Sequence, residues 1–217
     1  MRDQLKKAIW TALYQGTTSV VPKAHVLEIL SRLQPAAHDQ RMGAGFRDGV
    51  NMATPVHNAA ADDKRELLRH ALATLAYRGG KSLRGAPADF AEFRVAETSR
   101  TPAQILAHIG DLLDWALSMA RSNQQWHDST PLPWHEEEHR FFAALQALED
   151  YLMSGQPLGV SPEKLLQGPI ADAFAHVGQI AMLRRIAGSP VKAENYAKAE
   201  VVAGRVGPEQ TPPKREF

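Results

Sequence analysis

Four stretches of the chain repeat their apolar residues with the period of an α-helix, and this pattern limits the possible folds more than any other feature. We found no convincing strand pattern between them. Four amphipathic segments with short to medium connections predict an all-α, up-down-type four-helix bundle. The stretches run from Asp62 to about Tyr77, from Thr101 to about Arg121, from Pro133 to Ser154 and from Pro169 to Gly188.

Helix start and stop signals mark the ends of these stretches. Thr101 precedes Pro102, and a capping residue before a first-turn proline is a strong start signal. Gly79 and Gly80 are expected to end the first bundle helix, because glycine is the usual residue just past a helix end. Pro169 is expected to interrupt a short helical turn upstream and to open the fourth helix.

The helical core is expected to have an extension on each side. Residues 1–61 form an N-terminal extension and linker, with short helical patterns at 4–14 and 23–34 followed by a stretch rich in Gly, Ala, Asn and Asp. Residues 62–190 form the four-helix bundle. Residues 191–217 are rich in Gly and Pro but carry some apolar side chains, so we expect a C-terminal tail that packs on the bundle.

Composition narrows the classes of partner. Lys and Arg number 25 and Asp and Glu number 24, so the net charge of +1 gives no electrostatic reason to expect nucleic acid or an anionic membrane. No apolar run reaches the about 20 residues that cross a bilayer. The absence of cysteine excludes disulfides, thiolate metal sites and a cysteine nucleophile. We expect a cytoplasmic protein that acts on a small molecule and forms a homodimer.

Two histidines and one aspartate lie where helices of a bundle can bring them together. His176 is at the edge of the apolar arc of the last helix, and Asp172, four residues earlier, shares its face. His108 is at the edge of the apolar arc of the second helix. Two imidazoles and a carboxylate suit Zn²⁺, Ni²⁺ or Fe²⁺ and leave open coordination positions. The alternative is that the histidines are satisfied core residues and Asp172 is a helix-surface carboxylate.

The segment 176–180, His-Val-Gly-Gln-Ile, together with the isolated His108 resembles the DinB-like superfamily of four-helix-bundle metalloproteins. The resemblance covers roughly residues 62–190. In that family three histidines bind a divalent metal, one on the second helix and two in a His-x-x-x-His on the fourth. His108 and His176 match the first and the last, and Asp172 replaces the middle one. The resemblance therefore implies either a two-histidine, one-carboxylate site or a site that has lost its metal.

Two functional hypotheses follow from this resemblance. Relatives in the family include thiol-dependent transferases and isomerases as well as hydrolases, so the first hypothesis is a metal-dependent transferase or hydrolase. There a metal-bound water or thiolate would be the nucleophile, and no general base can be named. The second is a metal-free helical bundle that serves dimerisation or partner binding. Metal content separates the two.

A second motif competes with this site. Residues 135–139 read His-Glu-Glu-Glu-His, which matches the zinc-protease pattern in which two histidines hold the ion and a glutamate is the general base. The predicted core line of that helix passes through Glu138 and Phe141, about 100° away from both histidines. Acidic residues are also common in a first helical turn, where they interact favourably with the helix dipole. A solvent-exposed first turn is therefore the alternative interpretation of this segment.

Four other side chains have expected positions. Trp115 and Met119 have nearly the same helical phase as His108, so they would line the approach to a site there while packing in the core. Arg184 and Arg185 are near the end of the fourth helix, where a cation interacts favourably with the dipole. Either arginine could also meet an anionic substrate.

Overall fold

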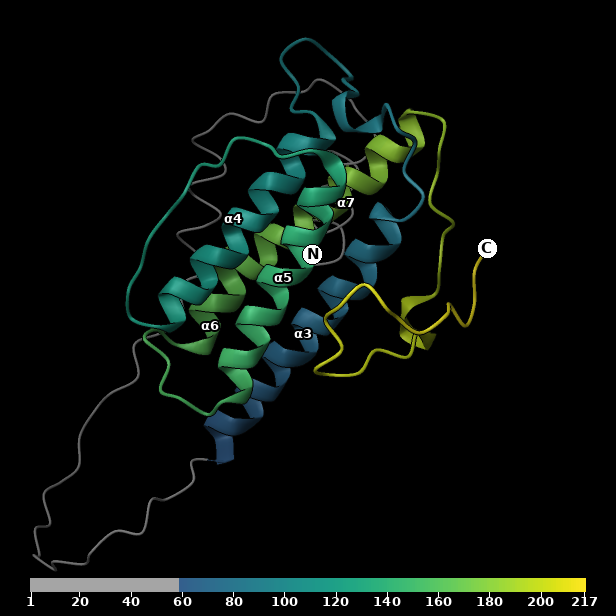
Figure 1. Ribbon diagram of the computed structural model, residues 1–217. Helices are drawn as coiled ribbons and strands as arrows, with labels where there is room; N and C mark the ends of the chain where they lie inside the picture. Colours follow the sequence, from purple (N-terminus) through teal and green to yellow (C-terminus); the bar gives the residue numbers. More distant parts are fainter. Residues whose placement is uncertain (1–58) are drawn as a thin grey trace, which may run out of the picture. The chain divides into compact units, whose positions relative to one another are not determined.

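A computed structural model of the protein describes residues 59–217. Within this range four long helices pack against one another and no strand forms, so the all-α class is confirmed (Figure 1). None of the helices in this range is long and apolar enough to cross a membrane. The predictions made for residues 1–58 lie outside the described residues. The long helices are α3 Ala59–Leu83, α4 Pro102–Ala120, α5 Trp134–Met153 and α7 Ala171–Ile186.

The four helices do not alternate strictly in direction. α3 and α4 each pack against both α5 and α7, so these two consecutive helices occupy diagonal positions. α4 and α5 run the same way, because Arg140 in the first half of α5 binds Asp111 in the middle of α4, and Arg121 just after α4 lies over Tyr151 near the end of α5. The connection 121–133 therefore runs along the length of the bundle (Figure 1). The predicted up-down alternation is wrong at this step.

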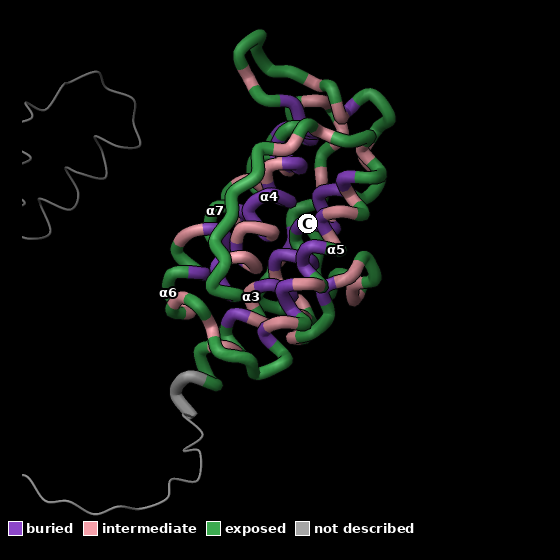
Figure 2. Tube along the Cα trace, turned by 60° about the vertical axis from the view of Figure 1, so that its left-hand side comes forward, coloured by how far each residue is buried: buried purple, intermediate pink, exposed green. Residues whose placement is uncertain are grey.

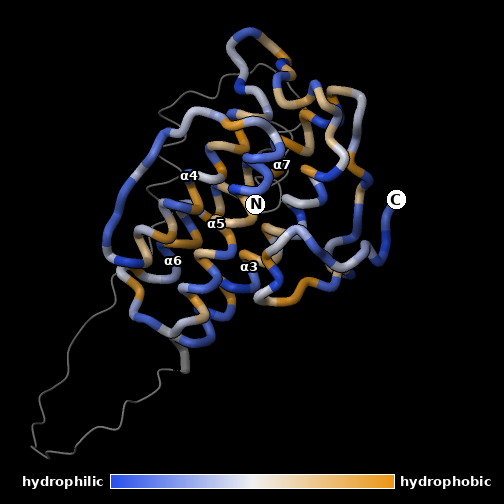
Figure 3. The backbone as a smooth tube through the Cα atoms, viewed as in Figure 1, coloured by the Kyte–Doolittle hydropathy of each residue, from blue (hydrophilic) through white to orange (hydrophobic). Residues whose placement is uncertain are grey.

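The core lies between the inward faces of the four helices. Figure 2 shows buried positions recurring once or twice per turn on each long helix, and Figure 3 shows hydrophobic positions interspersed in the same way. This is the periodicity that the sequence contains, and it removes apolar surface from water on every helix. The largest fully buried side chains are Leu68, Leu72, Leu75, Leu83, Phe90, Leu106, Ile109, Leu113, Phe141, Leu145, Leu148 and Leu152.

α3 continues past Gly79 and Gly80, so the prediction that these glycines end the helix is wrong. A Cβ built on Gly79 would lie 2.6 Å from Cζ of Phe141, and one on Gly80 would lie 3.3 Å from Cζ of Phe142. The glycines are needed because the rings of α5 lie directly against the backbone of α3. Glycine occurs at these two positions because of packing between helices, which helix propensity does not reveal.

We expect Gly79→Ala to destabilise the protein by about 1–3 kcal/mol, because the new methyl group overlaps the buried Phe141 ring. Gly178→Ala on α7 is the matched control. Its added Cβ meets nothing within 4 Å, and exchange of an exposed helical glycine for alanine should stabilise by about 0.5–1 kcal/mol. Urea denaturation of both variants measures the difference. If Gly79→Ala is also stabilising, the close approach to Phe141 does not matter.

The chain before α7 stays helical instead of being interrupted at Pro169. The short helix α6 Pro162–Leu165, capped by Ser161, leads into the π-helix η2 Leu166–Ile170, which joins α7 directly. Proline has no N–H and its ring crowds the preceding turn, and a wider π turn accommodates both effects. The π turn also sets the phase with which α7 begins, and α7 carries two of the predicted ligands.

The segment after α7 is bound to α3 by charged and aromatic contacts. Lys81 donates to Glu194 at 2.6 Å and to Glu216 at 2.8 Å, and the hydroxyl of Tyr77 donates to Glu194 at 2.6 Å. Burial and the neighbouring Glu194 carboxylate raise the pKa of Tyr77. The ring of Tyr196 packs edge-on against Tyr77, so this part of the tail lies against α3.

Arg184 closes the end of the bundle where α3 and α7 finish. Its side chain is buried and donates to the backbone carbonyls of Ser82, Arg84, Gly85 and Ser189. No carboxylate pairs with it among the residues that the structure describes, and burial lowers its pKa. Arg184 therefore caps the C-terminal turn of α3 as well as the end of its own helix, which is more than the dipole interaction we predicted.

Candidate metal centre

The start of α4 fixes the position of His108. The hydroxyl of Thr101 accepts a hydrogen bond from the backbone N–H of Gln104, and the side-chain Oε1 of Gln104 accepts one from the N–H of Thr101. This reciprocal capping box satisfies two N–H groups that the helix itself leaves unpaired. The first turn is thereby ordered, and His108 follows on the side of α4 that faces α7.

His108 meets Asp172 and His176 of α7. The Nε2 atom of His108 lies 3.9 Å from Oδ2 of Asp172, and Nε2 of His176 lies 3.5 Å from Oδ1 of the same carboxylate. The two imidazole rings are perpendicular, with centroids 4.7 Å apart. One ligand atom from each residue lies within 4.8 Å of the others. The structure thus brings together the three residues that the sequence predicted as ligands.

A neighbouring glutamine lies within hydrogen-bond distance of the His176 ring. Its Nδ1 lies 3.0 Å from Oε1 of Gln179, one turn further along α7. An amide oxygen accepts hydrogen bonds, so this contact suits the tautomer that has its proton on Nδ1 and its lone pair on Nε2. The Nε2 atom is the one directed at Asp172. Metal-binding histidines commonly have such a partner on their other nitrogen. Gln179 belongs to the segment quoted above, but we predicted no role for it.

Trp126, a residue of the α4–α5 connection, covers His108. Its ring packs edge-on to the His108 ring at 5.6 Å and to Trp115 at 5.7 Å. Trp115 therefore packs against both Trp126 and the core, and Met119 is buried in the core. Trp126 was not predicted from the sequence, since a residue in a polar connection has no periodicity that places it.

Burial lowers the pKa of His108, and the charges of His176 and Arg100 act in the same direction. Asp172 and Asp111 oppose them and are outweighed. A lower pKa keeps the His108 imidazole neutral at neutral pH, which is the form that binds metal.

An ionic cluster holds the α4–α5 connection in place. Asp111 is buried and accepts hydrogen bonds from the backbone N–H and the hydroxyl of Ser129 and from Arg140. Burial alone would raise the pKa of Asp111, but the hydrogen bonds from Arg140 and Ser129 lower it overall. Glu137 accepts from the N–H of Leu132 at 2.9 Å. These contacts fix the connection that carries Trp126.

The N-terminal half of α5 differs from the prediction by one position. Glu137 is buried, whereas we placed Glu138 on the core line; Glu138 is only partly covered, and burial raises its pKa. Glu137 lies one turn before Phe141 on the same face, but a charged residue is not expected in a core, so its burial was not predicted. It is tolerated inside because the Leu132 N–H and the nearby Arg140 guanidinium, 3.7 Å away, offset the loss of water.

The zinc-protease motif at 135–139 does not form a site. The His135 side chain is 81% exposed, and its contact with the adjacent Glu136 is 3.9 Å long. Among residues 59–217 the one group of three side chains with metal-binding geometry is His108, Asp172 and His176, and it includes neither His135 nor His139. The interpretation as a solvent-exposed first turn accounts for the segment.

The donor set was compared with the requirements of a divalent ion. Protein nitrogen and oxygen ligands lie about 2.0–2.2 Å from zinc, so two ligands of one tetrahedral ion are separated by roughly 3.4 Å. The contacts of 3.5 and 3.9 Å between the imidazoles and Asp172 approach this value, although they reach different oxygens of the carboxylate, and one donor atom from each of the three residues lies within 4.8 Å of the others. Two Nε2 atoms and a carboxylate are also chemically suitable ligands. The residues therefore fit a divalent metal.

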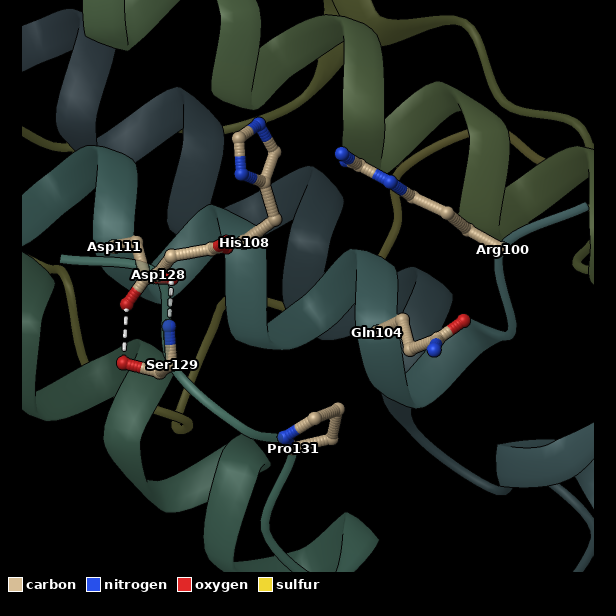
Figure 4. A pocket seen from close by; sticks show the side chains of 7 residues that line it. All are labelled: Arg100, Gln104, His108, Asp111, Asp128, Ser129 and Pro131. Carbon is tan, nitrogen blue, oxygen red and sulfur yellow. Dashed lines mark hydrogen bonds between the residues drawn. The ribbon is translucent and has the colours of Figure 1, made fainter.

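A cavity of about 170 Å³ adjoins the site on one side of His108 (Figure 4). Its walls come from the segment before α4, from α4 and from the α4–α5 connection, so the cluster around Asp111 also shapes it. The lining residues are Arg100, Gln104, His108, Asp111, Asp128, Ser129 and Pro131.

No protein-family model, no curated protein and no solved structure matches the chain. The molecule itself shows a four-helix domain and a His108, Asp172 and His176 group that could hold a metal ion. Its function is therefore inferred from these two features.

Proposed function

We propose that the chain is a divalent-metal-binding protein of the DinB-like kind in which His108, Asp172 and His176 hold the ion. The observation that carries this proposal is the convergence of two imidazole Nε2 atoms and one carboxylate from two packed helices. Both helices are regular and well packed at this level, so the ligands are held by rigid elements. Rigid support of this kind is what a precise ligand geometry requires.

The reaction that best fits this arrangement is a metal-dependent transfer to a thiol, or a hydrolysis, of a small molecule. A bound Zn²⁺, Ni²⁺ or Fe²⁺ would supply Lewis-acid activation at the open coordination position. The protein contributes the rest: Trp126 shields one side of His108 from water, and the cavity beside His108 gives a small molecule access. Gln179 lies 3.0 Å from Nδ1 of His176, which leaves Nε2 of that ring for an ion.

The test of this proposal is the metal content and metal affinity of the untagged protein. Elemental analysis should find close to one divalent ion per chain, and stripped protein should take up one equivalent of Zn²⁺ or Ni²⁺ in a calorimetric titration. A panel of thiol-transfer and hydrolysis reactions would then be run on the loaded protein. If no divalent metal binds, the alternative of a metal-free bundle for dimerisation or partner binding replaces the proposal.

Asp172 distinguishes this site from the three-histidine pattern and gives a specific prediction. A carboxylate is shorter than an imidazole, and the Asp172 side chain is 50% exposed, so it is the less constrained ligand. We expect Asp172→His to tighten Zn²⁺ or Ni²⁺ binding by roughly tenfold and Asp172→Ala to weaken it by at least as much, each change equal to about 1.4 kcal/mol.

Asp63→Ala removes an exposed carboxylate of α3 and serves as the matched control, with unchanged affinity expected. All four proteins can be compared in one competition titration with a zinc indicator. If both Asp172 variants bind with the affinity of the parent, Asp172 is a solvated helix-surface carboxylate and not a ligand.

A further inference from the structure

The cavity beside His108 contains a cation without a protein counter-ion. In Figure 4 the Arg100 side chain reaches over α4 with its guanidinium directed toward the His108 ring. Across residues 59–217 Arg100 forms no ion pair and no side-chain hydrogen bond. The Asp111 carboxylate in the same wall is already engaged by Arg140 and Ser129. The charge of Arg100 is therefore available to a bound molecule.

A second donor faces the same space. The Oε1 atom of Gln104 accepts the N–H of Thr101 in the capping box, so the amide orientation is fixed and its NH₂ group is left to donate elsewhere. The hydroxyl of Ser129 already donates to Asp111. Besides the N–H of the His108 ring, the donors that remain for a ligand in this wall are thus the guanidinium of Arg100 and the amide of Gln104.

Charge and size restrict what fits between these donors. A guanidinium pairs well with planar carboxylates and with phosphates. Asp128 is an exposed carboxylate of the same cavity and makes no ion pair with any described residue, so it repels a dianion more than a monoanion. The volume of about 170 Å³ is many times the roughly 15 Å³ that one water needs, yet it is too small for a folded partner.

We propose that this cavity binds the carboxylate of a small monocarboxylic acid between Arg100 and Gln104. The ligand then lies against the imidazole of His108, with Asp128 able to accept a hydrogen bond from a hydroxyl or amino group. The interpretation of this acid as the substrate rests on the proposed metal function. The binding of the carboxylate does not, since Arg100 and Gln104 are not ligands of the ion.

The test uses full-length protein stripped with 1,10-phenanthroline, a chelator without a carboxylate, and then desalted. Lactate, acetate, malonate and inorganic phosphate are titrated separately and followed by calorimetry and ligand-observed NMR. Because no metal is present, a carboxylate cannot bind by coordinating an ion. We expect lactate to bind in preference to malonate and phosphate.

Two variants locate the binding. Arg100→Gln removes the cation, and Gln104→Glu keeps an oxygen acceptor for the Thr101 N–H while replacing the amide donor by a charge. Each should weaken lactate binding at least tenfold. Arg185→Gln removes an exposed arginine of α7 that does not line the cavity, and it should leave lactate binding unchanged. Circular dichroism checks that each variant is folded, and Arg100→Lys should keep part of the affinity.

The inference is overturned if none of the four anions binds, if phosphate or malonate binds more tightly than lactate, or if folded Arg100→Gln retains parental lactate affinity. Zinc titration of Arg100→Gln separates this result from the metal hypothesis, because the variant keeps all three proposed ligands and should still take up one equivalent of metal. If the parent binds lactate through Arg100 but takes up no metal, the proposed function fails and the carboxylate site stands.

Discussion

Replacing His176 by alanine is expected to abolish stoichiometric binding of a divalent metal, and His108→Ala is expected to do the same. Each change removes one of three protein ligands, and we expect affinity to fall at least about 100-fold, or roughly 2.7 kcal/mol. Helical content should change little, because alanine favours helix and both side chains lie at the edge of the core. Elemental analysis, zinc titration and far-ultraviolet circular dichroism measure these effects.

His135→Ala is the matched control, since His135 is an exposed histidine on α5 outside the ligand group. It should keep the full metal content of the parent. One equivalent of metal bound with parental affinity by His108→Ala or His176→Ala would remove that residue from the site. Loss of metal in His135→Ala would instead support a metal site at residues 135–139.

Arg184→Met is expected to lower the free energy of unfolding by about 3–5 kcal/mol. The variant keeps a long side chain but leaves the carbonyls of Ser82, Arg84 and Gly85 without their donor. Each buried polar group that loses its hydrogen-bond partner destabilises the protein by about 1–3 kcal/mol. Water that enters can bind some of these carbonyls, so the net loss of stability is smaller than the sum over all of them. Chemical denaturation followed by circular dichroism measures the change.

Arg185→Met is the comparison, because Arg185 is the exposed neighbour on the same helix. A surface exchange of this kind usually changes stability by less than about 0.5 kcal/mol. If the two variants are equally stable, water replaces the guanidinium at the end of α3 without loss, and Arg184 is not a structural cap.

Local signals were sufficient to predict most of the helices. Thr101 and Pro102 marked the start of α4 correctly, because a cap is a short-range interaction written in consecutive residues. The prediction that Gly79 and Gly80 end the first helix failed because their role is set by a long-range contact. Their role depends on Phe141 and Phe142, which are more than 60 positions away in the chain and touch α3 only in the folded protein. From the sequence alone, a glycine that ends a helix cannot be distinguished from a glycine that lets another helix pack closely against it.

Helical phase placed His108 and His176 at the edges of apolar arcs and Asp172 on the face of His176, and the family resemblance selected these three as ligands; the structure brings them together. The surroundings of the group were not. Trp126 and Arg100 lie in or next to irregular segments, and their positions depend on contacts that close loops. A period of 3.6 residues carries no information about such segments.

The contacts of Lys81 have a consequence for the order in which the molecule can be completed. Lys81 binds Glu194 and Glu216, which are 113 and 135 residues further along the chain. During synthesis α3 leaves the ribosome long before Glu194 and Glu216 do. In the same way, α4 with His108 leaves the ribosome before α7, which carries Asp172 and His176. A nascent chain that ends before α7 presents one side of the bundle core to water, where chaperones and proteases act. The three residues of the candidate site can therefore come together only after most of the chain has been translated.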